Sequence, residues 1–347
     1  QSERAFKLAT TNMAAVRFLM FGTIISILWF GGGMIRVGAM QVGELTGFLS
    51  YVLQILNSLM MISNIFLMLT RSLASGKRIM EVLDEEIDIT EDKARDIEVT
   101  KGEVEFRHVY FKYKKEAPEY VLSDINLHIR PGETVGIVGQ TGSAKTTLVQ
   151  LIPRLYDITS GELLIDGRPV EEYPLKNLRD AVAVVLQKNT LFSGTLRENL
   201  LWGDSSASRE EIEEACRTAG ADEFIGRLEQ GYDTEMGQGG VNVSGGQKQR
   251  LCIARAILKK PKVLILDDST SAVDTATEAD IRERLAERLP HMTKIIIAQR
   301  ISSVRHAGQI VVLDDGRVQG VGTHEELLAG NKIYREIYES QKEGADL

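Results

Sequence analysis

Cysteine, histidine and clusters of basic residues are scarce in this chain of 347 residues. The two cysteines, Cys216 and Cys252, stand in no local motif, which favours a reducing compartment over a disulfide framework. The five histidines are scattered and form no His-Glu-x-x-His pair, so the sequence does not favour a zinc site. A formal net charge of -8, without a Lys/Arg cluster to offset it, argues against nucleic acid as the main partner.

Charged residues are missing from two stretches near the start, residues 18–35 and 45–70. As a helix the second would be about 39 Å long, against roughly 30 Å of hydrocarbon, so we predict membrane-spanning helices over about residues 16–35 and 45–70. The connection between these stretches, residues 36–44, has Arg36 as its one basic residue, and the other ends of both stretches carry several. The positive-inside rule therefore predicts that both outer ends lie in the cytoplasm. The basic residues at those ends are Arg4, Lys7, Arg17, Arg71, Lys77 and Arg78. We therefore expect a multi-pass protein of the plasma membrane, with two helices inside a large soluble core as the alternative.

The segment of residues 84–96 is acidic and lacks aromatic residues. We interpret residues 86–99 as a solvated linker between a membrane part, residues 1–85, and a second domain, residues 100–342, followed by a tail of residues 343–347. The chain opens at Gln1 in a polar run typical of mid-helix, without an initiator Met, and we interpret it as a fragment.

The stretch GQTGSAKTT, residues 139–147, follows a short apolar run and precedes an apolar helical face made by Leu148, Leu151, Ile152 and Leu155. A Gly-rich turn between a strand and a helix directs backbone N–H groups and the positive end of the helix toward one point, which suits a polyphosphate. Lys145 would reach the outer phosphates, and the Thr146 hydroxyl would take one position on Mg²⁺. The alternative is a flexible turn with an exposed lysine.

Ala144 stands where the phosphate-loop pattern has its second glycine. If the position needs a positive φ, alanine costs about 1 kcal/mol there, and otherwise little.

Short β-rich runs from Gly102 onward alternate with helical stretches and predict an α/β fold. The first runs cover residues 104–109, 121–129, 134–138 and 163–165. The runs at residues 183–186, 263–266 and 294–298 are apolar on both faces, as in a buried parallel sheet. A helical insert places Ile212, Ala215, Cys216 and Ala219 on one face, and Thr323 with Glu326 predicts a capping box before the final helices.

Two further motifs follow the phosphate loop. Asp267 ends the run at residues 263–266, and an acid at the tip of a parallel strand is where a phosphate-loop ATPase holds Mg²⁺ through water. The stretch VSGGQKQR, residues 243–250, precedes it and leads into a helix. A Ser-Gly-Gly at a helix start is a second phosphate cradle, although alone it is more often a capped turn.

In this order the motifs resemble those of the ABC transporter family, specifically exporter-type half-transporters with a membrane domain before the ATPase domain. Residues 1–85 are similar to the last two of six spanning helices, and residues 100–340 to a complete nucleotide-binding domain. The resemblance implies a P-loop NTPase fold, with a RecA-like core, an antiparallel β subdomain and a helical subdomain, preceded by an all-α transmembrane helix pair. It implies ATP and Mg²⁺ as cofactors and ATP hydrolysis as the activity.

The resemblance also implies site residues, taken position by position. Tyr113 resembles the aromatic that stacks on adenine, with a core tyrosine as the alternative, and Gln187 resembles the Q-loop glutamine, with a plain strand-end residue as the alternative. The implied Walker A loop is Gly139, Gln140, Thr141, Gly142, Ser143, Ala144, Lys145, Thr146 and Thr147, and the implied Mg²⁺ ligands are Thr146, Gln187 and Asp267. The implied signature, which closes over ATP held by another subunit, is Ser244, Gly245, Gly246 and Gln247, and the implied D-loop is Ser271, Ala272, Val273 and Asp274.

Two positions depart from the family pattern at the catalytic residues. Asp268 stands where the family has its catalytic Glu, and Gln299 where it has the switch histidine. Asp is one methylene shorter, and a misplacement of about 1 Å can cost roughly 100-fold in rate. Gln299 cannot carry a proton. This pair resembles the degenerate subunit of heterodimeric bacterial multidrug exporters, whereas the signature is nearly intact, with Val243 in place of Leu.

We therefore expect one half of a heterodimeric exporter that couples ATP binding and hydrolysis to export of amphipathic drugs or lipids, with Lys145, Asp268 and Gln299 at its own weak catalytic site. As given, the chain lacks four of the six expected spanning helices and should not transport. The alternatives are a homodimeric exporter in which Asp268 is an adequate base, and an ATP-sensing module that does not hydrolyse. A soluble ABC ATPase of DNA repair or translation disagrees with the two spanning helices and the net charge.

Overall fold

A computed structural model describes residues 2–268 and 275–343 of the chain. The contacts divide it into two compact units, Gln1–Ile87 and Asp88–Leu347. Each unit is described by itself below.

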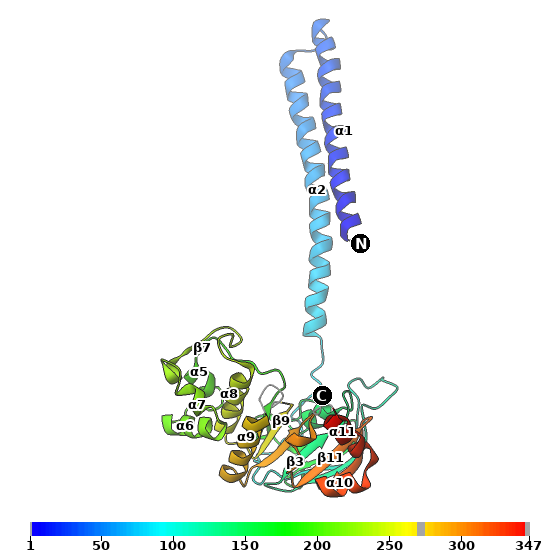
Figure 1. The fold of residues 1–347 in the computed structure, drawn as a ribbon. Coiled ribbons are helices and arrows are strands. Elements are labelled where there is room, and N and C mark those ends of the chain that lie inside the picture. The colour runs from blue at the N-terminus through cyan, green and yellow to red at the C-terminus, as the bar shows by residue number, and fades with distance from the viewer. Residues whose placement is uncertain (1, 269–274, 344–347) are drawn as a thin grey trace. The chain divides into compact units, whose positions relative to one another are not determined.

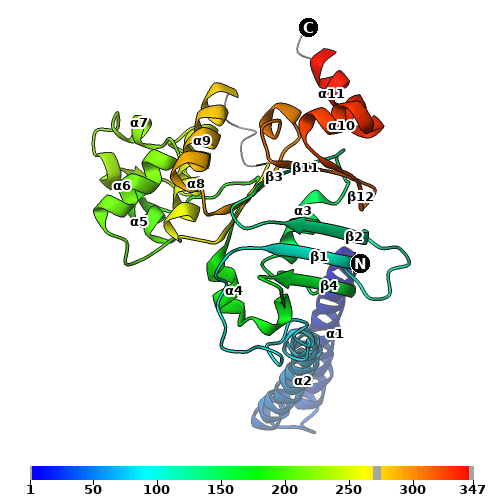
Figure 2. The same cartoon turned by 90° about the horizontal axis from the view of Figure 1, so that it is seen from below.

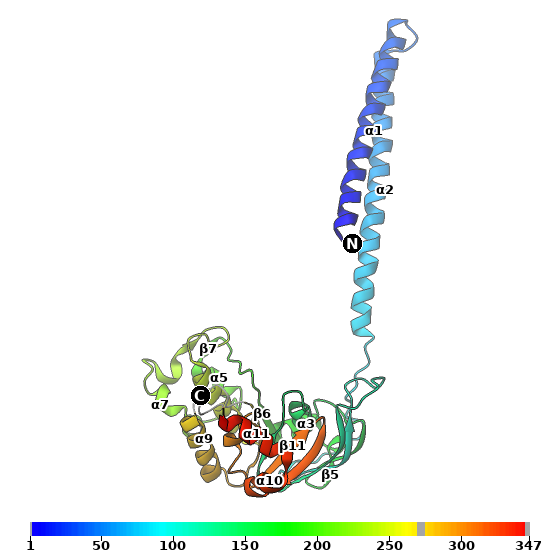
Figure 3. The same ribbon diagram turned by 45° about the vertical axis from the view of Figure 1, so that its right-hand side comes forward.

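The first unit consists of two long helices, α1 (Ser2–Arg36) and α2 (Val42–Leu83), which run side by side (Figures 1 and 3). They come close at Gly31, where an added Cβ would lie 2.3 Å from the end of the Leu45 side chain, so a larger residue would require that side chain to move. The segments Val16–Arg36 and Val42–Leu83 are long and apolar enough to cross a membrane, and their most apolar 18-residue windows have mean hydropathies of 1.9 and 1.8.

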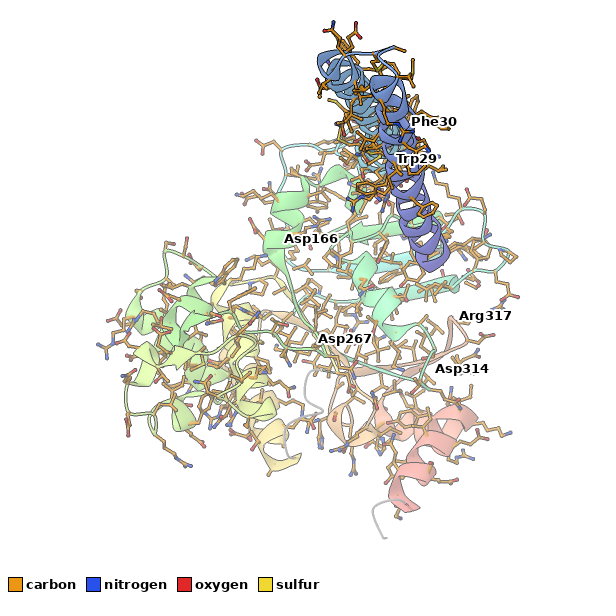
Figure 4. All side chains as sticks on the ribbon, turned by 90° about the horizontal axis from the view of Figure 1, so that it is seen from above. Trp29, Phe30, Asp166, Asp267, Asp314 and Arg317 are labelled. Atoms are coloured by element: carbon orange, nitrogen blue, oxygen red, sulfur yellow. The ribbon has the colours of Figure 1, made fainter. Side chains whose placement is uncertain are left out.

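The apolar side chains of these helices point outward rather than into a core. In the most apolar windows of α1 and α2 only 6% and 0% of the residues are buried. Trp29 and Phe30 on α1 are 78% and 72% exposed, and Figure 4 shows both. Helices buried in a large soluble core, the alternative to spanning helices, are therefore not what the structure shows.

A six-stranded sheet forms the centre of the second unit, in the order β12-β11-β3-β10-β9-β6. All neighbours are parallel except β12, which runs antiparallel to β11. The strands are β3 (Thr134–Val138), β6 (Val182–Val185), β9 (Val263–Asp267), β10 (Thr293–Ile297), β11 (Gln309–Asp314) and β12 (Arg317–Gly322). Every residue of β9 and β10 is buried, so the predicted parallel sheet with two covered faces is confirmed.

An antiparallel sheet, in the order β2-β1-β4-β5, covers one side of this core. Its strands are β1 (Val104–Phe111), β2 (Leu122–Ile129), β4 (Ser160–Ile165) and β5 (Arg168–Pro169). Helix α3 (Lys145–Leu151) lies between the two sheets (Figure 2), and its buried residues Leu148, Val149 and Leu151 share one hydrophobic cluster with both. The start of α3 is thereby fixed against the end of β3.

A helical group forms the other side of the unit (Figure 2). It contains α5 (Leu196–Leu201), α6 (Arg209–Thr218), α7 (Asp222–Ile225), α8 (Gly245–Leu258), η2 (Gly231–Asp233) and the short pair β7 (Gly194–Thr195) and β8 (Glu235–Met236), and it contacts α9 (Thr275–Arg288). The predicted apolar face of Ile212, Ala215, Cys216 and Ala219 is buried, which confirms the helical insert. RecA-like core, antiparallel sheet and helical group are the three parts that the resemblance implied.

The remaining elements are η1 (Val170–Glu172), α4 (Leu175–Ala181), η3 (Ile301–Ser303), α10 (His324–Gly330) and α11 (Lys332–Glu343). Helix α10 begins with the predicted capping box, in which the Thr323 hydroxyl accepts from the Glu326 N–H at 3.3 Å and Glu326 accepts from the Thr323 N–H at 2.8 Å.

Most of the segment predicted as a linker is bonded to the second unit. Arg95 N–H donates to Glu172 at 2.8 Å, Asn177 donates to the Ile97 carbonyl at 3.0 Å, and Val99 is 5% exposed. Residues 88–99 belong to the compact unit Asp88–Leu347 although most of their side chains are exposed, and the interpretation of residues 86–99 as a linker stays a prediction.

Candidate functional site

The loop between β3 and α3 passes close to other backbone and bends through left-handed conformations. A Cβ on Gly139 would lie 2.0 Å from the Leu313 carbonyl oxygen, so only glycine fits there. Gly142 has φ 88° and Ala144 has φ 69° with ψ 24°. The position of Ala144 therefore requires a positive φ, and its alanine bears the cost of about 1 kcal/mol that the sequence left conditional.

Lys145 and Thr146, the first residues of α3, face the two aspartates at the end of β9. The Lys145 ammonium donates to the Gly139 and Gln140 carbonyls, both at 2.8 Å, and the Thr146 hydroxyl donates to Asp267 Oδ1 at 3.1 Å. Burial lowers the pKa of Lys145, while the charges of Asp268 and Asp267 oppose that shift. A lysine held by loop carbonyls is already aimed at the space the loop encloses.

The carboxyl group of Asp267 lies inside the domain and is 5% exposed, and Figure 4 labels it among the central side chains. Burial raises its pKa and the neighbouring Asp268 adds to this, whereas the hydrogen bond from Thr146 and the charge of Lys145 lower it. A hydroxyl and a carboxylate 3.1 Å apart are two of the hard oxygen donors that Mg²⁺ prefers.

Asp268 is held by two amides from opposite sides. Gln187, just after β6, donates to Asp268 Oδ2 at 3.0 Å, and Gln299, just after β10, donates to the same oxygen at 2.6 Å. The backbone of Asp268 is left-handed, with φ 45°, and its N–H donates to Ile297 at 2.9 Å. Burial raises the pKa of Asp268, and the hydrogen bonds from Gln299 with the charges of Lys145 and Arg300 counter the shift. The carboxylate is 8% exposed and pinned by two donors.

Tyr113 lies beside the loop and is tied to it. Its hydroxyl is 2.9 Å from the Thr147 hydroxyl, and its ring meets Tyr156 edge-on with centroids 5.1 Å apart. The ring is 51% exposed, which separates it from a core tyrosine and leaves a surface for a planar ligand. Tyr156 was not singled out from the sequence, because it lies more than forty residues from Tyr113 and no spacing rule connects them.

These donors fit a nucleotide triphosphate and its metal ion. The loop presents backbone N–H groups and a lysine for phosphate, Thr146 with Asp267 offers oxygens for Mg²⁺, and Gln187 reaches the same carboxylate pair. Within residues 2–268 and 275–343, no group of three His, Cys, Asp or Glu side chains could hold a metal ion alone. A divalent ion here would therefore take its other ligands from phosphate and water.

The signature residues lie in the helical group rather than at this loop. Ser244 is the N-cap of α8, and its hydroxyl accepts from Gln247 N–H at 3.3 Å while Gln247 accepts from Ser244 N–H at 2.9 Å. Figure 2 shows α8 with α5 and α6, and α3 against the antiparallel sheet. Gly245 and Gly246 form the first turn of α8. The predicted D-loop, with Asp274, lies outside the described residues.

Fold and site together define a P-loop nucleotide-binding domain of the ABC type. Residues 122–271 match the family model described as ABC transporter, so this region is an ABC transporter ATP-binding domain.

Individual relatives extend the similarity to the N-terminal helices. The chain is 44% identical over 344 residues to YfiB of Bacillus subtilis strain 168, an uncharacterized ABC transporter ATP-binding protein, with 99% of this chain and 59% of that protein covered. It is 40% identical to YgaD of the same strain, named as a candidate multidrug export ATP-binding/permease protein. That similarity covers 95% of this chain and 58% of YgaD. The structure of a bacterial Atm1-family ABC exporter with ATP bound aligns at a TM-score of 0.74 and 33% identity. The alignment covers 98% of this chain and 59% of the exporter chain.

Along the chain, two membrane-type helices thus precede an ABC transporter ATP-binding domain, and the similarity to the Atm1-family exporter covers both. The chain spans about three fifths of the length of the proteins it matches.

Proposed function

We propose that this chain is part of an ATP-binding and permease subunit of an ABC exporter, which couples ATP binding and hydrolysis to export of amphipathic drugs or lipids across the plasma membrane. Support comes from the phosphate loop packed against Asp267, from two exposed apolar helices, and from a relative named for multidrug export. Gly139 to Thr147 would bind the phosphates, Tyr113 the adenine ring, and Thr146, Gln187 and Asp267 the Mg²⁺ side. Mg²⁺ bound with ATP would neutralise phosphate charge.

We further propose that the chain's own site hydrolyses ATP weakly. The observation that carries this is the pair of amides on one oxygen of Asp268, from Gln187 at 3.0 Å and Gln299 at 2.6 Å. A general base must reach the water whose proton it takes, and the short Asp268 side chain is held back by both donors. Gln299 offers an amide that donates but cannot carry a positive charge.

The signature supports a role for this chain in a partner's site. Ser244, Gly245, Gly246 and Gln247 form a capped helix start whose geometry is complete without a nucleotide. Together with Asp274 they would close over ATP bound by a second half-transporter that supplies its own Glu and His. The proposed assembly is accordingly a heterodimer with one weak and one active site.

The test uses the full chain in lipid nanodiscs. ATP turnover and MgATP binding are measured for the wild type and for the Asp268→Glu, Gln299→His double variant, and a Lys145→Ala change in each background is the control for contaminating ATPases. We expect MgATP binding in both proteins and turnover that rises at least about tenfold in the double variant, since the longer carboxylate and the imidazole restore the base and its partner. Turnover must disappear with Lys145→Ala.

Each other result favours a named alternative. Wild-type turnover that rises more steeply than linearly with protein concentration and is abolished by Asp268→Asn identifies a homodimer with Asp268 as an adequate base. MgATP binding without turnover in either protein supports an ATP-sensing module. No MgATP binding at all contradicts the whole proposal.

A further inference from the structure

A glutamine of the last helix holds the main chain of the segment that carries Gln299. Gln341, near the end of α11, accepts a hydrogen bond from the Ile301 N–H at 2.9 Å and donates one to the Gln299 carbonyl at 2.7 Å. One amide side chain thus satisfies a donor and an acceptor two residues apart, as a neighbouring strand would. The two partners lie 40 and 42 positions away in the sequence.

The same segment holds the buried carboxylate of the nucleotide site. The Gln299 side chain donates to Asp268 at 2.6 Å, while its carbonyl accepts from Gln341. Two residues later η3 begins at Ile301, whose side chain is 2% exposed within the large hydrophobic cluster. The position of the Gln299 side chain therefore depends on a main chain that is fixed on one side by the core and on the other by Gln341.

Helix α11 is seated firmly enough to act as the support. Tyr334 is fully buried and its hydroxyl is 2.8 Å from His324 Nδ1, while Ile337 and Tyr338 pack against the same cluster as Ile301. These residues and Gln341 recur at positions i, i+3, i+4 and i+7, which is one face of a helix. The buried face of α11 consequently ends in the glutamine that holds the Gln299 segment.

We propose that Gln341 is a positioning residue of the nucleotide site and that α11 is mechanically coupled to that site through residues 299–301. The inference rests on the proposed function, because it assigns a role in nucleotide turnover. It predicts that seating of α11 and binding of MgATP influence each other, as linkage requires of coupled sites.

Hydrogen exchange tests the coupling without any need for turnover. The full chain in nanodiscs is compared with Gln341→Leu, which removes both hydrogen bonds, and with Gln341→Glu, which keeps the acceptor for Ile301 and loses the donor to Gln299. Glu339→Leu, an exposed change on the same helix, is the matched control. We expect the Ile301 amide to exchange at least about tenfold faster in Gln341→Leu, and at the wild-type rate in Gln341→Glu and Glu339→Leu. We also expect MgATP to slow exchange in α11 of the wild type and of Glu339→Leu, but not in Gln341→Leu.

A kinetic arm then tests the positioning role. In the Asp268→Glu, Gln299→His background, Gln341→Leu should lower kcat about tenfold while the MgATP Kd stays within about twofold, because a displaced residue 299 affects the reaction more than ground-state binding. Unchanged Ile301 exchange in Gln341→Leu, or an equal response of α11 to MgATP in both proteins, overturns the inference. A background variant that does not turn over contradicts the proposed function instead, and the exchange arm still decides this inference.

Discussion

Substitution of Asp166 tests how strongly the segment before β1 is held to the rest of the second unit. Asp166 lies in the turn after β4 with φ 49°, and its carboxylate accepts from four consecutive backbone N–H groups, those of Thr100, Lys101, Gly102 and Glu103, at 2.7 to 2.9 Å. These bonds fix residues 100–103, which lead into β1, against the end of β4. Figure 4 labels Asp166.

The expected cost can be worked from these contacts. Hydrogen bonds to a charged group contribute about 1.5–3 kcal/mol each, but the four share one carboxylate and two of them are exposed, so we expect about 3 kcal/mol for Asp166→Ala, including about 1 kcal/mol for alanine at positive φ. Asp166→Asn keeps a residue that tolerates this φ and one accepting oxygen, so about 1.5 kcal/mol is expected. Comparing the Asp166→Ala and Asp166→Asn variants separates the contribution of the negative charge from the contribution of the backbone conformation.

The pH dependence has a definite sign. Burial alone would raise the pKa of Asp166, but the hydrogen bonds from Lys101, Glu103 and Thr100 outweigh it and lower the pKa. A carboxyl whose folded pKa is lowered contributes stability above its unfolded value of about 3.9 and loses it as the pH falls through the folded value. Urea unfolding of the wild type and Asp166→Asn should therefore differ most near neutral pH and converge below about pH 4. An Asn variant within about 0.5 kcal/mol of wild type at pH 7 would refute the reasoning.

Three further predictions concern the site and the core. Ala144→Gly should raise the free energy of unfolding by about 0.5 kcal/mol, because glycine relieves the strain of the positive φ by more than it adds to the entropy of the unfolded chain. Ala144→Val should lower the free energy of unfolding by more than about 1 kcal/mol. Changes of the same sign for both variants in urea unfolding would contradict this prediction. Tyr113→Ala should weaken ATP binding about tenfold while Tyr113→Phe leaves the Kd nearly unchanged, since in the proposed site the ring, and not the hydroxyl bonded to Thr147, would contact the base; equal losses in equilibrium binding would contradict this. Burial raises the pKa of Cys216 to about 12, so iodoacetamide at pH 8 should leave it unlabelled in the folded chain and label it in urea, as mass spectrometry would show.

The motifs and most of the core could be predicted from the sequence because they are local. A phosphate loop between a strand and a helix, apolar runs covered on both faces, and a capping box each depend on neighbours along the chain. Two strands of the six-stranded sheet were not predicted, β11 and the edge strand β12. The apolar run of β11 is only four residues long, and the glycines and alternating, half-exposed side chains of β12 make a weak strand signal. The conformation at Ala144 could only be stated as a condition, because sequence spacing does not give φ.

The resemblance implied that Gln187, Asp268 and Gln299 belong to the nucleotide site, but the hydrogen bonds around Asp268 could not be predicted from the sequence. Gln187 and Gln299 lie 81 and 31 positions from Asp268, and Gln341 lies 42 positions from Gln299, so their contacts exist only after the sheet has set its strand order. Each glutamine alone is an ordinary surface residue type. Only the fold shows that Gln187 and Gln299 meet at the Asp268 carboxylate and that Gln341 bonds to the main chain of Gln299.

The Oδ2 atom of Asp268 accepts hydrogen bonds from two separate segments of the domain, so its bonding depends on the positions of both. Gln187 follows β6, Gln299 follows β10 and Asp268 follows β9, which lies between these two strands. A movement of either flanking segment away from β9 must break one of the two bonds, while movement of both frees Oδ2 from both amides. The state of that single oxygen therefore reports on two separate parts of the domain at once.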